Sequence, residues 1–213
     1  MMLDGLDDYI LSHIDPEPPE LRQLARDVNV YLLYPRMCSG HLQGRILHML
    51  TTMIRPSRVL EIGTYAGYSA LSIAGALEQG AELHTIEIDD EMEDFILARF
   101  KASEAGHRIT LHIGDAATII PTLGDDPWDM VFIDANKRSY CDYYEMILPR
   151  VRPGGYILAD NTLWDGKILD PDHNHDPQTR GIIDFNNLVA ADDRVERVIL
   201  PLRDGLTIIR KKP

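Results

Sequence analysis

The chain has 213 residues, with 21 Lys and Arg against 34 Asp and Glu, so its formal net charge is −13 at pH 7. An acidic surface repels nucleic acid and anionic lipid, which makes both poor candidates for partners. Two cysteines, Cys38 and Cys141, are too few for a disulfide framework or a cysteine-rich zinc site. The start of the chain lacks a signal-peptide pattern, and no apolar run approaches the roughly 18 residues of a membrane span. From these two features we expect a cytoplasmic protein. We also expect one domain over 1–213, since domains usually span roughly 100–200 residues.

The stretch 1–55 carries helical patterns separated by helix breakers. Helices are expected over 3–12, 21–33 and 42–54. Pro16, Pro18 and Pro19 separate the first two helices, and Pro56 ends the third. We interpret 1–55 as a helical N-terminal extension.

From Arg58 onward, strand and helix patterns alternate. Strands are expected over 58–63, 82–89, 109–114, 128–135, 155–160, 195–202 and 206–211. Helices are expected over 67–78, 91–105, 116–123, 140–151 and 179–190. Asp90 and Glu93 form a capping-box pattern at the start of the second of these helices. Such alternation requires a parallel sheet with helices on both faces.

The last two strands differ from the others. Asp204 and Gly205 separate two apolar runs, which is a hairpin signal, so the final strand should be antiparallel. The six-stranded parallel dinucleotide fold does not end in this way. The sequence therefore predicts an α/β fold with a seven-stranded, Rossmann-like sheet of the class I methyltransferase type.

Ligands of open α/β sheets bind beyond the carboxyl ends of the strands, so the residues that follow each strand are informative. Gly63 and Gly67 permit a tight turn and close approach to a ligand, although a plain strand-to-helix turn would use the same pair. Glu87 ends the second strand, where a carboxylate can bind the two hydroxyls of a ribose. An unpaired charge inside a strand is costly, which favours function there. Asp115 could cap a helix or contact adenine, and both readings stay open.

Polar side chains also gather after the fourth and fifth strands. Asp134 and Lys137 follow the fourth strand, and Asp160 and Asn161 follow the fifth. Because these strands should be neighbours, two carboxylates, an amide and an amine meet at one edge of the sheet. Such an all-oxygen donor set suits Mg²⁺ rather than zinc. Each pair alone could be a helix cap or an ordinary turn, but the two together favour a metal site.

Several stretches of the chain, taken together, resemble one enzyme family. They are VLEIGTYAGYSAL, TIEID, GDA, FIDANKRSYCDYY, PGGYILADNTLW and DGLTIIRK. They resemble the cation-dependent O-methyltransferases, which include catechol and caffeoyl-coenzyme A O-methyltransferases and bacterial relatives. The resemblance runs from about Met37 to Arg210. It implies methyl transfer from S-adenosylmethionine to one hydroxyl of a vicinal aromatic diol, with Mg²⁺ or another divalent cation such as Mn²⁺ or Ca²⁺, and it implies a homodimer.

The resemblance also assigns roles to individual residues. It implies that S-adenosylmethionine is bound by Met37, Ser39, Glu61, Gly63, Thr64, Ser69, Glu87, Asp115, Ala116, Asp134 and Asn136. It implies Asp134, Asp160 and Asn161 as metal ligands. Lys137 matches the lysine that takes the substrate proton, and with Asp134 it forms the catalytic set. Asn136 departs from the family, since many members carry aspartate there, and the change removes a negative charge beside the cofactor sulfonium.

Other interpretations stay open at this point. A NAD(P)-dependent oxidoreductase on a similar sheet would explain Gly63, Gly67 and Glu87, but not the metal motifs or the terminal hairpin. A non-catalytic cofactor-binding protein is a third possibility, which the complete metal triad disfavours. His173 and His175 lie in a polar, proline-flanked segment and are assigned to a solvated loop.

Several residues near the motifs are assigned to packing. These are Cys38, Tyr140, Tyr143 and Tyr144. Trp164 is evenly balanced between packing and a wall of the substrate site. The natural methyl acceptor is not specified by the sequence.

Overall fold

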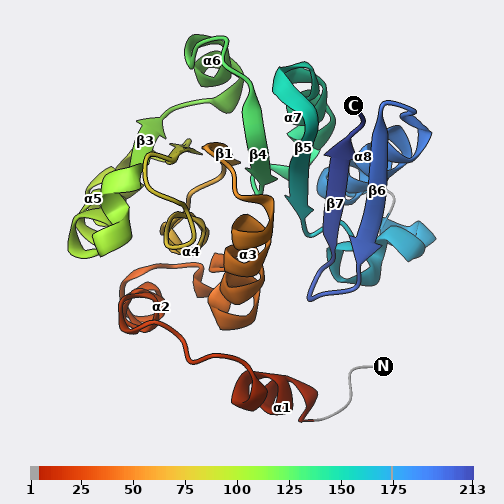
Figure 1. Ribbon diagram of the computed structural model, residues 1–213. Coiled ribbons are helices and arrows are strands. Elements are labelled where there is room, and N and C mark those ends of the chain that lie inside the picture. The colour runs from red at the N-terminus through yellow and green to blue at the C-terminus, as the bar shows by residue number, and fades with distance from the viewer. Residues whose placement is uncertain (1–4, 174) are drawn as a thin grey trace.

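The computed structural model describes residues 5–173 and 175–213. One sheet runs through the middle of the molecule, and helices lie on both of its faces (Figure 1). Its strands are β1 (Arg58–Ile62), β2 (Glu82–Glu87), β3 (Ile109–Ile113), β4 (Trp128–Ile133), β5 (Val151–Asp160), β6 (Val195–Leu200) and β7 (Leu206–Lys211). They pair in the order β3-β2-β1-β4-β5-β7-β6. The strands β1 to β5 are parallel, whereas β7 is antiparallel to both β5 and β6, which confirms the predicted hairpin.

The helices surround this sheet. They are α1 (Leu6–His13), α2 (Pro19–Tyr31), α3 (Gly40–Ile54), α4 (Tyr68–Ala74), α5 (Glu93–Ala102), α6 (Ala116–Ile119), α7 (Tyr140–Ile147) and α8 (Pro177–Ala191). In Figure 1, α1 lies apart from the sheet at the bottom of the view. An ion pair between Asp15 and Arg45 ties the segment after α1 to α3. Within the described ranges, the helices are too short or too polar to cross a membrane.

Two hydrophobic cores follow from the alternation of side chains along the strands. Successive strand residues point to opposite faces, so Val59 joins one core and Leu60 the other. The first core lies under α2 to α5. The second lies under α7 and α8, where the ring of Phe185 packs edge-on against Tyr140 and Tyr144, with centroids 5.3 and 6.0 Å away. Burial on both faces fixes the position of β1 and β4, and with it the position of their carboxyl ends.

The predicted helix over 140–151 is too long. It ends at Ile147, and β5 begins at Val151 rather than at residue 155. Pro149 lies in the short 3₁₀ turn between the two elements. Its missing N–H and fixed φ suit a turn better than a continued helix.

The predicted start of α5 is also wrong. Asp89, not Asp90, caps this region, because its Oδ1 accepts a hydrogen bond from Glu91 N at 3.1 Å. A 3₁₀ turn over 90–92 follows, and α5 begins only at Glu93. At the N-terminus, α1 begins at Leu6, and the first two residues of the predicted helix 3–12 lie outside the described ranges.

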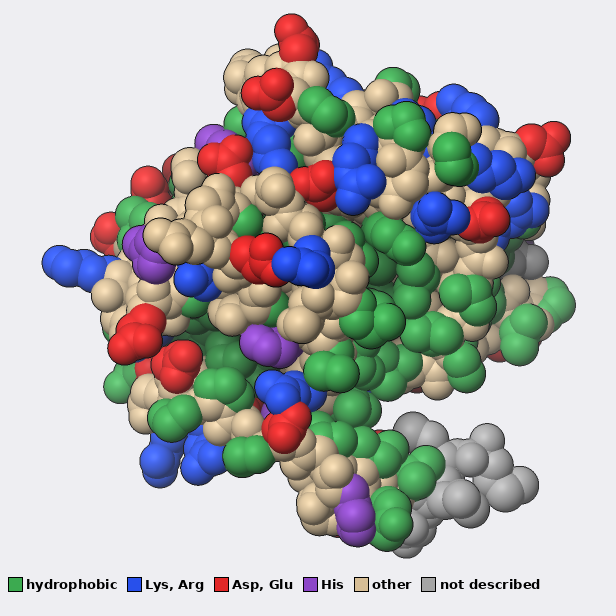
Figure 2. Space-filling view, in the orientation of Figure 1, with side chains coloured by type: hydrophobic (Ala, Val, Ile, Leu, Met, Phe, Trp, Pro, Cys, Tyr) green, Lys and Arg blue, Asp and Glu red, His purple; other side chains and the backbone are tan. Residues whose placement is uncertain are grey.

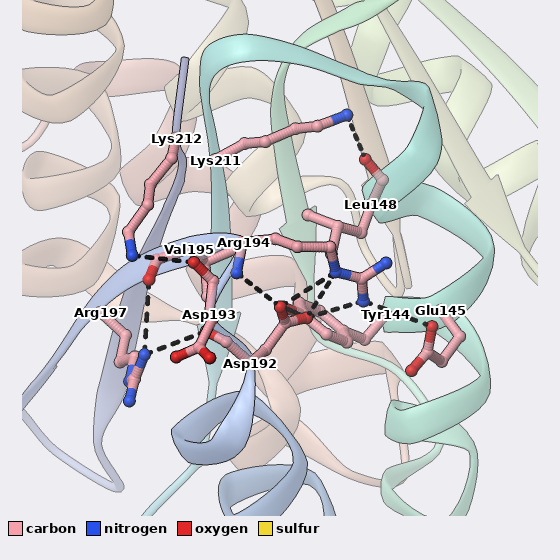
Figure 3. Close-up of polar contacts among 10 residues, drawn as sticks. All are labelled: Tyr144, Glu145, Leu148, Asp192, Asp193, Arg194, Val195, Arg197, Lys211 and Lys212. Atoms are coloured by element: carbon pink, nitrogen blue, oxygen red, sulfur yellow. Dashed lines mark hydrogen bonds and ion pairs between the residues drawn. The ribbon is translucent and has the colours of Figure 1, made fainter.

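A polar cluster holds the start of β6 against α7 (Figure 3). Asp192, at the end of α8, accepts hydrogen bonds from the Arg194 guanidinium at 2.7 Å and from Tyr144 Oη at 2.9 Å. The hydrogen bonds from Arg194 are the main reason why the pKa of Asp192 lies well below its usual range. Lys211 of β7 donates to Leu148 O at 2.9 Å. The cluster therefore anchors the terminal hairpin at the end opposite to the β6–β7 turn.

The helix α8 packs closely behind the loop that follows β4. A Cβ atom on Gly181 would lie 2.3 Å from Lys137 O and 2.9 Å from the Cα atom of Arg138. A larger residue would push the two elements apart. Glycine at this position therefore allows α8 to support the backbone of Lys137 directly.

Candidate active site

A cavity of about 990 Å³ opens at the carboxyl ends of the parallel strands. Most of the residues predicted for the site line it: Met37, Ser39, Gly63, Thr64, Ser69, Glu87, Asp115, Ala116, Asp134, Asn136, Lys137, Asp160 and Asn161. Glu61 is fully buried and lies behind the wall. The topology therefore brings together motifs that are far apart in the sequence.

The loop after β1 lies directly against the end of β4. Gly63 has a φ of 99°, and a Cβ atom there would lie 2.0 Å from Asp134 O. Gly67 has a φ of 85°, and a Cβ atom there would lie 2.6 Å from the ring of Phe100. The two glycines thus permit the tight turn that the sequence predicted.

Glu87 is fixed by backbone hydrogen bonds from two loops. Its Oε2 accepts from Tyr65 N at 2.7 Å, and its Oε1 accepts from Asp89 N at 3.0 Å. The carboxylate therefore joins the loops that follow β1 and β2. Each oxygen keeps a further lone pair, so the group can also accept hydrogen bonds from a ligand in the cavity.

Glu61 lies in β1 with its carboxyl group behind the wall. Its Oε2 accepts from Thr85 Oγ1, which lies 2.6 Å from Thr64 Oγ1. Burial raises the pKa of Glu61 to about 8, against the opposing effect of hydrogen bonds from Ser69 and Thr85. Among the described residues, Oε1 has no hydrogen-bond partner. A buried acceptor without a donor is costly, so this oxygen is open to a donor group of a ligand.

Two polar residues of the wall act as caps. Asp115 Oδ1 accepts from Ala117 N at 2.8 Å and caps α6, which confirms the capping interpretation. Asp115 also lines the cavity, and its contact with adenine stays a prediction. Asn136 caps the turn over 137–139 by accepting from Arg138 N at 3.3 Å.

Asp134 and Lys137 form an ion pair at the end of β4. Lys137 Nζ donates to Asp134 Oδ1 at 2.7 Å and to Tyr140 Oη at 2.8 Å. Tyr140 Oη lies within donating distance of Asp160 O, at 3.0 Å. Burial raises the pKa of Tyr140 well above its usual value, so its hydroxyl stays protonated. Lys137 Nζ also lies 6.0 Å from the ring centroid of Trp164.

Asp160 ends β5 and is buried beside this pair. Gln43 Nε2, from α3, donates to Asp160 Oδ2 at 2.6 Å. Burial first, and the charge of Asp134 second, raise the pKa of Asp160 above its usual value. Asn161 follows with a φ of 57°, a conformation that asparagine adopts more readily than most residues. In residues 5–173 and 175–213, no group of three His, Cys, Asp or Glu could hold a metal ion.

Sequence reasoning missed Tyr140 and Gln43, which contact this group, and Arg203, which contacts Gln43. Tyr140 packs in the core as expected, and its hydroxyl also accepts a hydrogen bond from Lys137, which was not expected. Gln43 was detectable in principle as a polar residue amid the apolar stripe of a predicted helix. Arg203, which donates to Gln43 Oε1, lies in a turn with no local signal for such a contact.

The remaining assignments are mixed. Tyr144 and Tyr143 pack in one core and Cys38 packs against the other, as expected, and Tyr143 and Cys38 also line the cavity. Trp164 lines the cavity as well. His175 is exposed, as expected of a solvated loop, and the side chain of His173 lies outside the described part of the chain.

Comparison with known proteins identifies the class. The sequence pattern of the O-methyltransferase family matches residues 12–212. Caffeoyl-CoA O-methyltransferase 2 of Zea mays is 35% identical, over 98% of this chain and 83% of that protein. The structure of the O-methyltransferase TomG from Streptomyces achromogenes in complex with SAM has a TM-score of 0.91 and 31% identity, over 100% of both chains. An O-methyltransferase from Bacillus cereus in complex with SAH has a TM-score of 0.90 and 28% identity, over 98% of this chain and 97% of that one.

The fold is that of the Rossmann-like class I methyltransferases, as the sequence predicted. The chain belongs to the O-methyltransferase family, whose members are methyltransferase enzymes.

The raised pKa of Glu61 predicts a pH-dependent stability. The folded protein keeps a proton on Glu61 up to about pH 8, whereas the unfolded chain releases it near about pH 4.3. The resulting stabilisation is complete below about pH 4.3 and is lost as the pH rises through about 8. Relative to Glu61→Gln, the free energy of unfolding of the ligand-free protein should fall by up to about 1.4 kcal/mol per pH unit in this window.

Urea unfolding of both proteins between about pH 5 and about pH 8 measures this difference. Glu82→Gln, an exposed glutamate at the other end of β2, is the matched control. Parallel pH profiles for wild type and Glu61→Gln would contradict the prediction.

Proposed function

We propose that this protein transfers a methyl group from S-adenosylmethionine to one hydroxyl of a vicinal aromatic diol, with a divalent metal ion. The observation that carries the proposal is the meeting of Asp134, Asp160 and Lys137 at the edge of the cavity. The cavity volume, about 990 Å³, suits a cofactor together with a small acceptor.

One side of the cavity fits S-adenosylmethionine. The unpartnered Oε1 of Glu61, beside Ser69, can accept from the cationic amino group of the methionine part, whose positive charge favours release of the carboxyl proton. Glu87 is placed for the ribose, and Asp115 with Ala116 for adenine. The other residues proposed for the cofactor are Met37, Ser39, Gly63, Thr64, Asp134 and Asn136. S-adenosylmethionine supplies an electrophilic methyl group, and the SAM-bound and SAH-bound relatives support this choice of cofactor.

The other side fits a hard divalent cation. Asp134, Asp160 and Asn161 offer oxygen donors, which Mg²⁺, Mn²⁺ and Ca²⁺ prefer. The charge of Asp134 disfavours ionisation of Asp160, and a cation near both would relieve this repulsion. A bound divalent ion supplies positive charge that holds both diol oxygens and lowers the pKa of one hydroxyl.

Lys137 is the residue that we assign to proton transfer. Its bonds to Asp134 and Tyr140 hold Nζ at the cavity wall. Nζ is an ammonium in this ion pair, and a divalent cation near Asp134 would favour release of its proton to solvent, so that the neutral amine could take the proton of the acceptor hydroxyl. Tyr140 orients the amine and keeps its own proton. Asn136 leaves one negative charge fewer near the sulfonium than an aspartate would.

Three observations bear on the alternative functions. The family match and the antiparallel β7 favour methyl transfer over hydride transfer with NAD(P). The buried Lys137 beside Asp134 favours a catalytic site over a site that only binds a cofactor.

We also propose one methyltransferase domain over 1–213, a cytoplasmic location and a homodimer. Figure 2 shows hydrophobic side chains gathered on the face that carries α3 and the front of β7 and β6. Met49, Met53 and Val198 are exposed. By register, Val198 stands on the same face as Leu158, which lies in the core beside α3. A second copy would remove this apolar surface from water.

Glu87→Gln should weaken S-adenosylmethionine binding about tenfold or more, because the variant loses the charge and one acceptor. Isothermal titration calorimetry measures the affinity, and adenosine alone should show the same loss. Glu82→Gln on the same strand is the matched control. Urea unfolding checks the fold, since Glu87 also binds Tyr65 N. An unchanged affinity would remove Glu87 from the ribose site.

Catechols should be methylated in the presence of Mg²⁺, and matched monophenols should not, because only two adjacent oxygens can share one cation. Chelation should abolish product formation, measured by mass spectrometry. Added Mg²⁺ should restore the wild type but not Asp134→Ala or Asp160→Ala. Asp184→Ala, an exposed carboxylate on α8, is the control. Full activity after chelation, or equal turnover of catechol and phenol, would exclude the metal-dependent reaction.

Light scattering should give the mass of a dimer, and Met53→Asp should lower that mass by placing a charge on the apolar face. A monomeric wild type would eliminate the dimer from the proposal.

A further inference from the structure

The β6–β7 turn contacts the candidate active site on the side formed by the segment that precedes α3. Arg203 lies in this turn and has a φ of 48°. Its Nη1 donates both to Ser39 O and to Gln43 Oε1. Ser39 lines the cavity, and Gln43 is a buried residue of α3. One guanidinium therefore joins the terminal hairpin to the segment that precedes α3 and to α3 itself.

The same turn also contacts the loop that follows β5. Leu163 N donates to Asp204 O at 2.7 Å, and Thr162 N donates to Gly205 O at 3.1 Å. These two N–H groups come directly after Asn161. The turn is thus held between the segment that precedes α3 and the loop after β5, which carries the proposed metal ligand Asn161.

Arg203 determines which end of the Gln43 amide faces Asp160. A guanidinium has only donors, so it must be paired with the amide oxygen. The amide nitrogen then faces Asp160 Oδ2, which lies 2.6 Å away and can only accept while ionised. In the reverse orientation, the amide nitrogen would face the guanidinium, with donor against donor. The amide oxygen would then face the Asp160 carboxylate, with acceptor against acceptor. The two contacts therefore specify one orientation of the amide.

We infer that Gln43 is a positioning residue for Asp160, and that Arg203 positions Gln43. This inference rests on the proposed function, in which Asp160 is a metal ligand. The hydrogen bond from Gln43 engages Oδ2 and restricts rotation of the carboxylate, so the other oxygen is held in one direction. Partners of this kind usually contribute about 10- to 100-fold to metal affinity.

The test is Mn²⁺ binding to the ligand-free protein, followed by the electron paramagnetic resonance signal of free Mn²⁺. Gln43→Met keeps the length of the side chain and removes both hydrogen bonds. It should weaken Mn²⁺ binding about 10- to 100-fold, while S-adenosylmethionine affinity stays at the wild-type value. Turnover should recover at saturating Mn²⁺, because the reacting groups remain in place.

Arg203→Met should weaken Mn²⁺ binding in the same direction but less, since the amide of Gln43 can still donate to Asp160. It should also weaken S-adenosylmethionine binding, because Ser39 O loses its donor. Arg210→Met, on the same hairpin but in an exposed ion pair with Glu196, is the matched control and should bind both ligands as the wild type does.

Wild-type Mn²⁺ affinity in a natively folded Gln43→Met protein would overturn the inference. If Gln43→Met fails to fold, Arg203→Met decides, because this residue lies in an exposed turn. It must then bind Mn²⁺ more weakly than Arg210→Met for the inference to stand. A wild-type protein that binds no Mn²⁺ would instead refute the metal in the proposed function.

Discussion

The contact between Gly63 and the carbonyl oxygen of Asp134 sets the spacing on which the candidate active site depends. Asp134 N donates to Ile62 O at 2.9 Å, so the pairing of β1 with β4 continues to the rim of the cavity. A side chain at position 63 would separate the two strand ends. Because the loops touch, the groups proposed for the cofactor and those proposed for the metal share one wall. This closeness suits a reaction in which positioning provides much of the rate.

The site concentrates ionisable groups that the rest of the fold must support. Glu61 and Asp160 are buried carboxyls whose pKa values burial raises, and Lys137 is a buried cation. Buried ionisable groups lower the stability of the ligand-free fold, but they suit ligand binding, because a ligand supplies further hydrogen-bond or charge partners. The two cores lie on the two faces of the sheet and extend to the cavity wall, where Ile62 and Ala66 line it, whereas the cluster around Asp192 anchors the terminal hairpin at the far end of β6. The polar site is therefore supported by apolar cores whose outermost residues form part of its wall.

Much of the fold was predictable because its signals are local. Apolar runs defined the strands, and Asp204-Gly205 defined the hairpin. The metal motifs were predictable as a group because parallel strands bring their carboxyl ends to one edge. Helix ends such as Ile147 were less predictable, since short 3₁₀ turns decide them. The contact of Gln43 with Arg203 was not predictable, because it joins residues 160 positions apart that share no pattern.

During synthesis on the ribosome, the residues that line the cavity are made well before β7, the strand that pairs with β5. Residues 34–164 contain nearly all of the lining residues, but β5 has no antiparallel neighbour until β7 is made. Asp160 is paired with Leu206 in that register. Until the hairpin has emerged, β5 is an open sheet edge, a state prone to pairing with other chains. The edge that bears Asp160 is therefore the last part of the site to be closed, and it stays open to pairing with other chains until that step.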